Sequence, residues 1–408
     1  MISPAWRIRD AKEEDMEIIR SLFYSEGFGD VAEPNGIRVA AKLDNTILGA
    51  CRCEQLSDGK FYIRPVAVFE VARGSGVGIA LVKDALKIYP QLFLVAEGPT
   101  KGFYKKCGFE ECSWDEIAYE QSNECDLCQD RQTCGPAPMK SSQVKHAITL
   151  LGTSSGCGVP AFFCHCKACE AARKDPTLKR GCTGALISGY QNILIDTPPD
   201  IRYQLIREDV CELDQVFLTH AHFDHLGGFG ELEYFVRLYM GASLPFYASE
   251  YAINETFKEF EYMRDCFDTK ILQDFETIEI DSLKIQALPL NHCPGTFGYL
   301  ITSPSGKRTF YAPDSGDFKP EVYELLRGID TLILDSTFWE NDTPYRTHHS
   351  VKQTIAEGLD LGAGKIVLTH LAPHICHEDE DIIEIIEEHI KQYEGRVILA
   401  HDGLKIEL

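Results

Sequence analysis

Residues 219–225 read THAHFDH and directly follow the run DQVFL, which has the pattern of a buried strand. Three imidazoles and a carboxylate in so short a stretch need partners, because polar groups are costly to bury alone. Single ligand-type residues follow other strand-like runs in the same half of the chain: His292, Asp314 and His370. A strand that ends at a fixed point aims the next side chain, so these runs predict one site built at several strand ends.

These residues favour a site for two divalent cations. Imidazole and carboxylate ligands suit zinc, manganese and iron alike, so the residues leave the identity of the metal open. Two cations that share a carboxylate stabilise both the attacking and the leaving oxygen when a phosphoester is hydrolysed. The alternative, in which each histidine only fills a core or surface position, requires several independent coincidences. The predicted ligands are His220, His222, Asp224, His225, His292, Asp314 and His370.

Charge and hydropathy narrow the class of partner. The chain has 40 Lys and Arg residues against 63 Asp and Glu residues, and its net charge of −23 disfavours stable nucleic-acid binding. No apolar run is long enough to cross a bilayer, and the first residues lack the apolar core of a secretion signal. We therefore expect a cytoplasmic protein that has a small-molecule substrate and no membrane partner. A homodimer remains possible.

The length of 408 residues predicts more than one domain. Residues 1–118 mix helix-like and strand-like runs, which indicates an α/β or α+β domain. Residues 119–143 are polar, contain several cysteines and show no period, so we expect a connector there. From residue 144 to residue 408, short strands alternate with helices and predict a second domain.

The run HAHFDH resembles the HxHxDH signature of the metallo-β-lactamase superfamily. This resemblance implies an αββα sandwich with a dinuclear metal centre at one edge of its two sheets. Two sets of ligands would each hold one cation: His220, His222 and His292, and Asp224, His225 and His370. Asp314 would bridge the two cations, and Asp196 in the run LIDT would support the site from behind.

Longer stretches of the second domain resemble the PhnP family, the phosphoribosyl cyclic phosphodiesterases of carbon–phosphorus lyase pathways. These stretches are LGTSSGCGVPAFFCHCKACEAARKDP, LPLNHCPGTFGYLI, the Asp314 segment, THHS and IVLTH. The resemblance implies a hydrolase of phosphonate catabolism that converts 5-phosphoribosyl 1,2-cyclic phosphate to ribose 1,5-bisphosphate. Asp224 and His348 would be catalytic, and His348 would protonate or steer the departing sugar oxygen. Its alternative reading, for either His348 or His349, is a plain loop residue.

The same fold leaves other hydrolases open. A 2′,3′-cyclic nucleotide phosphodiesterase and an RNA-processing nuclease are the alternatives, although the acidic composition argues against a polymer substrate.

A loop rich in cysteine predicts a further metal site. Three thiolates with one more ligand would form a closed tetrahedral zinc site in a segment too poor in apolar residues to fold alone: Cys164, Cys166 and Cys169. By the family resemblance, the fourth ligand comes from the loop after His370. His374 is the best match there, although Cys376 and His377 lie close in sequence. The chain would thus hold one structural zinc and two active-site cations, manganese or zinc.

The first domain resembles the GCN5-related N-acetyltransferases (GNAT) over about residues 5–118. The run VAVFEVARGSGVGIALVKDAL has a glycine-rich turn before a helix, where backbone N–H groups can face a pyrophosphate. The run LFLVAEGPTKGFYKKCGFEE matches the family's second signature, in which Tyr104 would protonate the departing thiolate. The resemblance implies that acetyl-CoA binds the loop of Arg73, Gly74, Ser75, Gly76, Val77 and Gly78. The alternative is a non-catalytic CoA sensor that regulates the hydrolase.

The predicted connector contains three further cysteines, Cys125, Cys128 and Cys134. They would bind a metal together with a fourth ligand such as Cys112, or remain reduced thiols.

Overall fold

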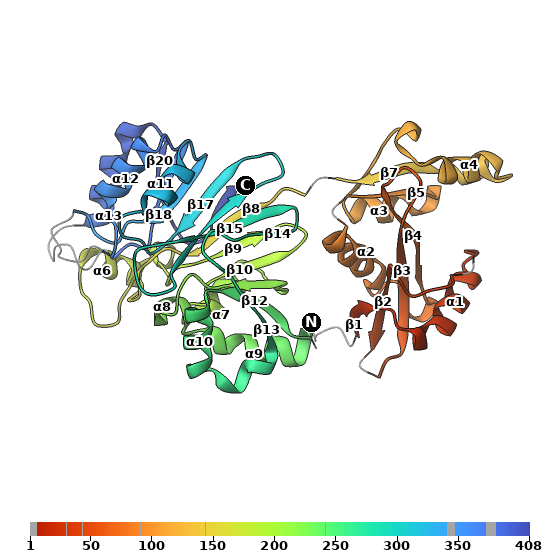
Figure 1. Ribbon diagram of the computed structural model, residues 1–408, viewed down its shortest axis with the longest axis horizontal. Coiled ribbons are helices and arrows are strands. Elements are labelled where there is room, and N and C mark those ends of the chain that lie inside the picture. Colours follow the sequence, from red (N-terminus) through yellow and green to blue (C-terminus); the bar gives the residue numbers. More distant parts are fainter. Residues whose placement is uncertain are drawn as a thin grey trace. The chain divides into compact units, whose positions relative to one another are not determined.

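The computed structural model describes residues 6–29, 31–42, 44–89, 91–142, 144–240, 242–340, 347–372 and 381–408. The chain divides into two compact units, Met1–Val144 and Lys145–Leu408. Each unit has its own sheet structure (Figure 1). Each also has its own apolar core. None of the helices in the described ranges is long and apolar enough to span a membrane.

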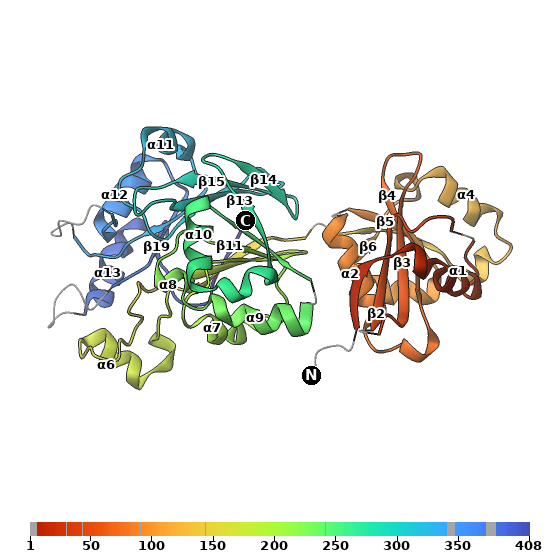
Figure 2. The same cartoon turned by 60° about the horizontal axis from the view of Figure 1, so that its bottom comes forward.

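The first unit is a seven-stranded mixed sheet with helices on both faces (Figure 2). Its strands follow in space as β1 (Trp6–Asp10), β2 (Ile37–Lys42), β3 (Ile47–Gln55), β4 (Phe61–Val68), β5 (Leu92–Ala96), β7 (Ala137–Ser141) and β6 (Phe109–Glu111). Ile37 and Val39 of β2 pack against the apolar side of α1 (Met16–Ser25). Arg38 lies between them and pairs with Asp84 of α2 (Val77–Ile88). Because successive side chains of a strand point to opposite faces, the two helices cover opposite faces of the sheet.

Residues 119–143 were predicted to be a connector, and that prediction was wrong. The segment forms α4 (Tyr119–Leu127) and α5 (Arg131–Cys134) and then β7, which lies between β5 and β6 in the sheet. The helix escaped prediction because α4 buries only Gln121 and therefore has no apolar stripe. Strand β7 has the sequence APMKS, whose proline and lysine hide its largely buried pattern.

The second unit consists of two seven-stranded sheets packed face to face. One sheet has the order β13 (Phe267–Ile271), β12 (Leu244–Ala248), β11 (Gln215–Phe217), β10 (Asn192–Ile195), β9 (Gly184–Ser188), β8 (Ala147–Gly152) and β21 (Leu404–Glu407). The other has the order β14 (Thr277–Ile280), β15 (Leu283–Pro289), β16 (Phe297–Thr302), β17 (Arg308–Ala312), β18 (Thr331–Asp335), β19 (Lys365–Thr369) and β20 (Val397–Leu399).

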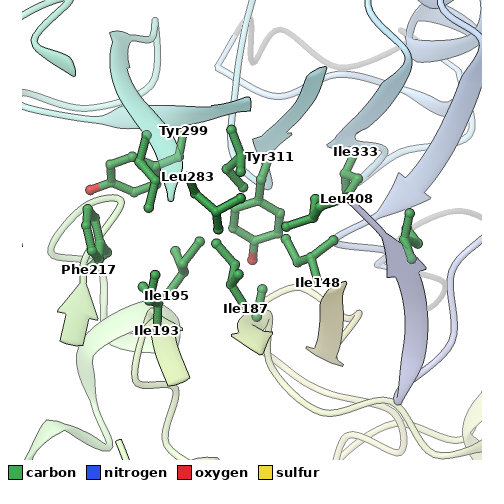
Figure 3. Packing of buried hydrophobic residues seen from close by; sticks show 14 of the residues in the cluster. Ile148, Ile187, Ile193, Ile195, Phe217, Leu283, Tyr299, Tyr311, Ile333 and Leu408 are labelled. Carbon is green, nitrogen blue, oxygen red and sulfur yellow. The ribbon is translucent and has the colours of Figure 1, made fainter. Parts of the chain in front are cut away.

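One apolar cluster joins the inner faces of these two sheets. Ile193 and Phe217 from the first sheet pack with Tyr299, Tyr311 and Ile333 from the second (Figure 3). Such a layer of interdigitated side chains fixes the separation and register of the sheets, and therefore the relative positions of their strand ends.

Helices cover the outer faces of both sheets and complete the predicted αββα sandwich, which is thereby confirmed (Figure 2). Helices α7 (Ile201–Arg207), α9 (Leu232–Tyr234) and α10 (Glu250–Glu259) lie against the first sheet. Helices α11 (Pro320–Leu326), α12 (Val351–Asp360) and α13 (Ile382–Ile390) lie against the second. Strands β10 and β11 run parallel, as do β17, β18 and β19, so the carboxyl ends in each set meet at one edge of their sheet.

Candidate functional site

All seven predicted ligands lie just beyond strand ends at this edge. Those of the HAHFDH run follow β11 and continue into the short helix α8 (Phe223–Leu226). His292 follows β15, Asp314 follows β17 and His370 follows β19. The apolar pattern of each strand ends shortly before the predicted ligand. The ligands are therefore positioned by rigid strands of the packed sheets.

The donor atoms of these residues fall into groups in which all atoms lie within 4.8 Å of one another. One group contains His220, His222 and His292, and another contains Asp224, His225 and His370. The structure thus brings together the two predicted sets, while metal binding by them stays a prediction.

Asp314 lies between the two groups. Its Oδ2 atom is 2.7 Å from Nε2 of His225. Its Oδ1 atom is 3.3 Å from Nε2 of His370 and 3.9 Å from Nε2 of His292. A carboxylate in this position can bind one cation with each oxygen, which is the arrangement needed for a bridging ligand.

The chemistry of the buried atoms fits divalent cations. Nε2 of His225, Nε2 of His370 and Oδ2 of Asp314 are buried without a hydrogen-bond partner, although buried polar atoms nearly always have one. Two of these atoms, in His225 and Asp314, are only 2.7 Å apart, yet their geometry is not that of a hydrogen bond. Nitrogen and oxygen lone pairs that converge without hydrogen bonds are what a cation site requires.

The Nδ1 atom of each of four imidazoles contacts a neighbouring oxygen atom. The contacts are His220 Nδ1 with Thr219 Oγ1 (3.0 Å), His225 Nδ1 with Asp196 Oδ2 (2.8 Å), His292 Nδ1 with the Thr347 carbonyl (2.9 Å) and His370 Nδ1 with Thr337 Oγ1 (2.8 Å). Contacts of this kind fix the ring orientation. Nε2 of His225 and of His370 has no hydrogen-bond partner, whereas Nε2 of His220 and of His292 contacts Nδ1 of His222 at 2.9 and 3.1 Å.

Asp196 lies behind the centre, where the resemblance placed it. It is fully buried, and its carboxylate accepts hydrogen bonds from the backbone N–H and the hydroxyl of Thr219 as well as contacting His225. Burial raises the pKa of Asp196, although His225 and Thr219 oppose this effect. Both Asp196 (φ 67°) and His370 (φ 58°) adopt the left-handed backbone conformation, and such strain is typical of functional positions.

Burial also sets the protonation of the imidazoles. It lowers the pKa of His220, His222 and His292, which favours the neutral form that ligates metals. Burial acts in the same direction on His225, but the nearby carboxylates, that of Asp314 first, raise its pKa well above the ordinary value.

Of the two adjacent histidines in THHS, only His348 faces the site. Its Nδ1 atom is 2.8 Å from Asp335 Oδ2 and 3.4 Å from Asp314 Oδ1, and its ring stacks on that of His370. His349 is buried and contacts the Ser315 carbonyl and the Glu357 carboxylate instead.

Two further residues of the site were missed by the sequence reasoning. Asp335 ends β18 in the run LILDS and anchors His348, and its other oxygen accepts a hydrogen bond from the Thr337 hydroxyl. Cys293 follows His292, and its sulfur belongs to the same group of donor atoms as His220, His222 and His292. Asp335 carried the same signal as Asp314, an aspartate at the end of an apolar strand.

The predicted zinc loop is preformed as far as it is described. The sulfur atoms of Cys164, Cys166 and Cys169 lie within 4.8 Å of one another at the start of α6 (Lys167–Lys174). The backbone N–H of Ala161 donates to the sulfur of Cys169 at 3.4 Å, as expected around a thiolate. The proposed fourth ligand, His374, and its neighbours Cys376 and His377 lie outside the described residues.

In the first unit, the predicted CoA loop leads into α2. Gly74 (φ 79°) and Gly76 (φ 88°) adopt backbone conformations that favour glycine, and Gly76 caps the helix. Arg73 donates a hydrogen bond to the Val68 carbonyl and pairs with Glu26 at 2.6 Å. Ser75, Val77 and Gly78 complete the turn, so the loop presents backbone N–H groups at the start of a 12-residue helix.

Beside this loop, strands β4 and β5 diverge. The two strands pair only at Phe61↔Leu92 and Tyr62↔Phe93 and separate beyond these positions. Tyr104 lies on α3 (Lys101–Lys106) and packs edge-on against Phe109. Burial raises the pKa of Tyr104, so its hydroxyl stays protonated at neutral pH.

The cysteines of α4 and α5 do not form a comparable cluster. Among the described residues, no group of donor atoms within 4.8 Å contains Cys125, Cys128 or Cys134, and none contains Cys112.

Comparisons with known proteins agree with this organisation. A family model described as a Beta-lactamase superfamily domain matches residues 191–371, and one described as Acetyltransferase (GNAT) family matches residues 5–109. The octanoyltransferase of Porphyromonas gingivalis is 30% identical over 275 residues, which cover 63% of this chain and 52% of that protein. The chain therefore spans about half the length of this relative. The coenzyme PQQ synthesis protein B of Cupriavidus taiwanensis is 25% identical over 64% of this chain and 99% of its own length.

Solved structures point the same way. A diphosphatase from the PhnP family has a TM-score of 0.56 and 29% identity, and the match covers 65% of this chain and 97% of that one. Zinc-bound PqqB from Methylobacterium extorquens has a TM-score of 0.55 and 21% identity over 64% of this chain and 100% of its own, a likeness that shows the fold alone. The chain thus joins a domain of the acetyltransferase (GNAT) family to a domain of the metallo-β-lactamase superfamily.

Proposed function

We propose that the second unit is a metal-dependent hydrolase of a small cyclic phosphodiester. The observation that carries this proposal is the position of Asp314 between two groups of imidazole and carboxylate donors. When bound there, two divalent cations, manganese or zinc, would supply charge to stabilise the phosphoryl transition state and would acidify the attacking water. The PhnP-like stretches of the sequence favour 5-phosphoribosyl 1,2-cyclic phosphate as the substrate and phosphonate catabolism as the context.

His348 is the proton donor in this proposal. Its Nδ1–H donates to Asp335, so its Nε2 is left to give a proton to the departing sugar oxygen. Burial alone would lower the pKa of His348, but the hydrogen bond and charge of Asp335 raise it to about 9. In the metal-free protein the imidazole therefore carries the proton that a general acid needs.

Asp224 is the second catalytic candidate. Its Oδ2 atom is 3.5 Å from Nε2 of both His225 and His370. Asp224 would therefore bind the second cation, next to the cation of the His220, His222 and His292 group. Gly156 approaches this carboxylate so closely that a β-carbon there would lie 3.1 Å from Oδ2. A side chain at this position would therefore push the Asp224 carboxylate by a few tenths of an ångström.

A pocket of about 390 Å³ adjoins His292 and suits a small substrate. Lys319 and Asn291 line it and supply a cation and an amide, while Asp317 adds one opposing charge. A sugar phosphate offers hydroxyl groups and an anion to such a surface. The pocket supports a small phosphorylated substrate more than a long polymer.

A second candidate reaction is hydrolysis of a small diphosphate. The solved structure with 29% identity is described as a diphosphatase of the PhnP family. The same donor groups and the same proton donor would serve a phosphoanhydride, whose leaving phosphate also accepts a proton.

For the first unit we propose acetyl-CoA binding beside the diverging strands β4 and β5. The loop of Arg73 to Gly78 would hold the pyrophosphate, and the hydroxyl of Tyr104 would protonate the departing thiolate. Isothermal calorimetry with acetyl-CoA, followed by an assay of acetyl transfer to a panel of amines, tests this. Binding without transfer, accompanied by changed hydrolase kinetics, would identify a sensor instead.

The hydrolase proposal is tested with purified protein loaded with manganese or zinc. Four substrates are compared: 5-phosphoribosyl 1,2-cyclic phosphate, 2′,3′-cyclic AMP, a nucleoside diphosphate sugar and bis(p-nitrophenyl) phosphate. We expect the ribosyl compound to give the largest kcat/KM and Asp314→Asn to abolish turnover. If the metal-loaded protein cleaves none of the four, the proposal is wrong.

A further inference from the structure

The thiol of Cys293 lies at the candidate metal centre, although the hydrolase mechanism does not use it. Cys293 is half-buried in the loop between β15 and β16, between His292 and Pro294. It also lines the 390 Å³ pocket, so solutes reach it from that side. Its sulfur is 3.2 Å from the Thr296 hydroxyl, which in turn donates to the Cys293 carbonyl and so holds the turn in place.

The sulfur belongs to a compact set of donors. Every donor atom of His220, His222, His292 and Cys293 lies within 4.8 Å of the other three. Neighbouring donors on one zinc ion are about 3–4 Å apart, given zinc–nitrogen and zinc–sulfur bonds of about 2.1 and 2.3 Å. Closing the set onto one cation therefore requires shifts of no more than about 1 Å. This is within the reach of side-chain rotations.

We propose that Cys293 is a further protein ligand of the cation held by His220, His222 and His292, in addition to the bridging Asp314. On binding, the thiol loses its proton to solvent and the thiolate sulfur coordinates the cation, so one proton is released for each cation bound. The inference rests on the proposed metal-dependent function, because it needs a cation at this group.

The thiolate makes the two groups chemically unequal. The first holds three nitrogens and a soft sulfur, whereas the second holds His225 and His370 with oxygens from Asp224 and Asp314. Sulfur ligands select thiophilic cations such as zinc, and carboxylate oxygens accept manganese. The first group therefore selects zinc, while the second accepts either cation.

Cadmium-113 NMR of the full-length protein tests the ligand directly, because each thiolate ligand moves the cadmium resonance downfield. The variant is Cys293→Ser, and Cys211→Ser, which changes an exposed thiol on the unit's surface, is the matched control. We expect Cys293→Ser to move one imidazole-site resonance upfield and Cys211→Ser to move none. The resonance from Cys164, Cys166 and Cys169 stays in place in both variants and shows that the fold is intact.

Metal preference gives a second readout. Wild-type and variant proteins are equilibrated with equal zinc and manganese, and the bound metals are counted by mass spectrometry. We expect Cys293→Ser to reduce the zinc preference of one site at least about tenfold, because a lost ligand should cost no less than a lost outer contact.

The outcomes separate the two proposals. If cadmium binds the imidazole groups and Cys293→Ser leaves every resonance and the zinc preference unchanged, Cys293 is not a ligand and the hydrolase proposal stands. If the wild-type protein shows no cadmium at the imidazole groups under saturating supply, both the metal-dependent function and this inference are overturned.

Discussion

Asp196→Asn changes a single atom behind the metal centre and tests whether that centre binds cations as proposed. The remaining carbonyl oxygen of the new amide side chain would still accept the two hydrogen bonds from Thr219. The amide nitrogen would replace the oxygen that lies 2.8 Å from His225 Nδ1, where two N–H groups would then face each other. His225 relieves this conflict by giving up the proton on Nδ1 and keeping one on Nε2, the nitrogen that faces Asp314.

The expected magnitude follows from this proton shift. A cation at the second group would have to displace the proton, and loss of such an outer contact typically costs about 10–100-fold in metal affinity. This corresponds to about 1.4–2.7 kcal/mol of binding free energy. The metal-free protein should change less in stability, because replacing a buried charge by an isosteric amide removes a desolvation cost as well as an interaction.

Asp281→Asn is the matched control for this substitution. Asp281 is also buried and also contacts a histidine, His146, at 3.1 Å. Its carboxylate accepts a hydrogen bond from the backbone of Gln191, just before β10, whereas Asp196 follows the opposite end of that strand. Asp281→Asn therefore tests the same chemistry away from the metal centre.

Competition with a fluorescent chelator measures metal affinity, and urea unfolding of the metal-free protein measures stability. We expect Asp196→Asn to weaken one cation by at least about tenfold and Asp281→Asn to leave both affinities unchanged. Equal affinities for Asp196→Asn and the wild-type protein would refute the view that Asp196 sets the tautomer of a ligating His225.

Three further substitutions test other parts of the molecule. His348→Ala should lower kcat about 10²–10⁴-fold for a sugar leaving group but little for p-nitrophenolate, which needs no proton. In the control His349→Gln, any change in kcat should be the same for both leaving groups, and an equal effect of His348→Ala on both would contradict its role as proton donor. Gly76→Ala should weaken CoA binding and lower the free energy of unfolding by about 1–2 kcal/mol, because alanine is strained at φ 88°. Calorimetry measures the binding and urea unfolding the stability, and unchanged values would contradict the role of the loop. The hydrogen bond from Arg9 lowers the pKa of Asp15 in the folded protein. The Asp15 carboxylate therefore stabilises the first unit fully above its unfolded pKa of about 4, and this stabilisation is lost as the pH falls through the lower folded pKa. Hydrogen exchange of α1 should show this acid-dependent loss in the wild-type protein and not in Asp15→Asn.

The grouping of the candidate ligands was largely predictable because these residues interrupt a regular pattern. Each apolar run ends at a ligand, and a buried strand gives a strong periodic signal, so both the strands and the positions of His292, Asp314 and His370 were visible in the sequence. Asp335 also follows an apolar strand, but no other ligand-type residue stands beside it to draw attention to this position. Cys293 was hidden for another reason, since its role depends on a contact with His220 and His222, which lie far away in the chain.

The first unit shows where pattern reading fails. Helix α4 is solvated on nearly all sides, so its sequence lacks the apolar stripe by which helices are found. Strand β7 is separated from its partner β5 by 40 residues, and only the folded sheet shows that it fills the place between β5 and β6. The pocket of the proposed substrate could not be predicted from the sequence either, because its wall joins the loop after β15 to the residues that precede α11.

The buried charges of the second unit link its stability to its chemistry. Asp196, Asp314 and Asp335 are at most 2% exposed, which places three carboxylates in a small volume at one sheet edge. Without cations, imidazoles alone must offset this charge, and the raised pKa of His225 and His348 shows that the carboxylates draw protons onto them. Two divalent cations, if bound as proposed, would replace those protons with stronger charges and would offset the cost of burying this cluster. On this reasoning, the carboxylates that make the centre reactive also make the fold depend on its metals.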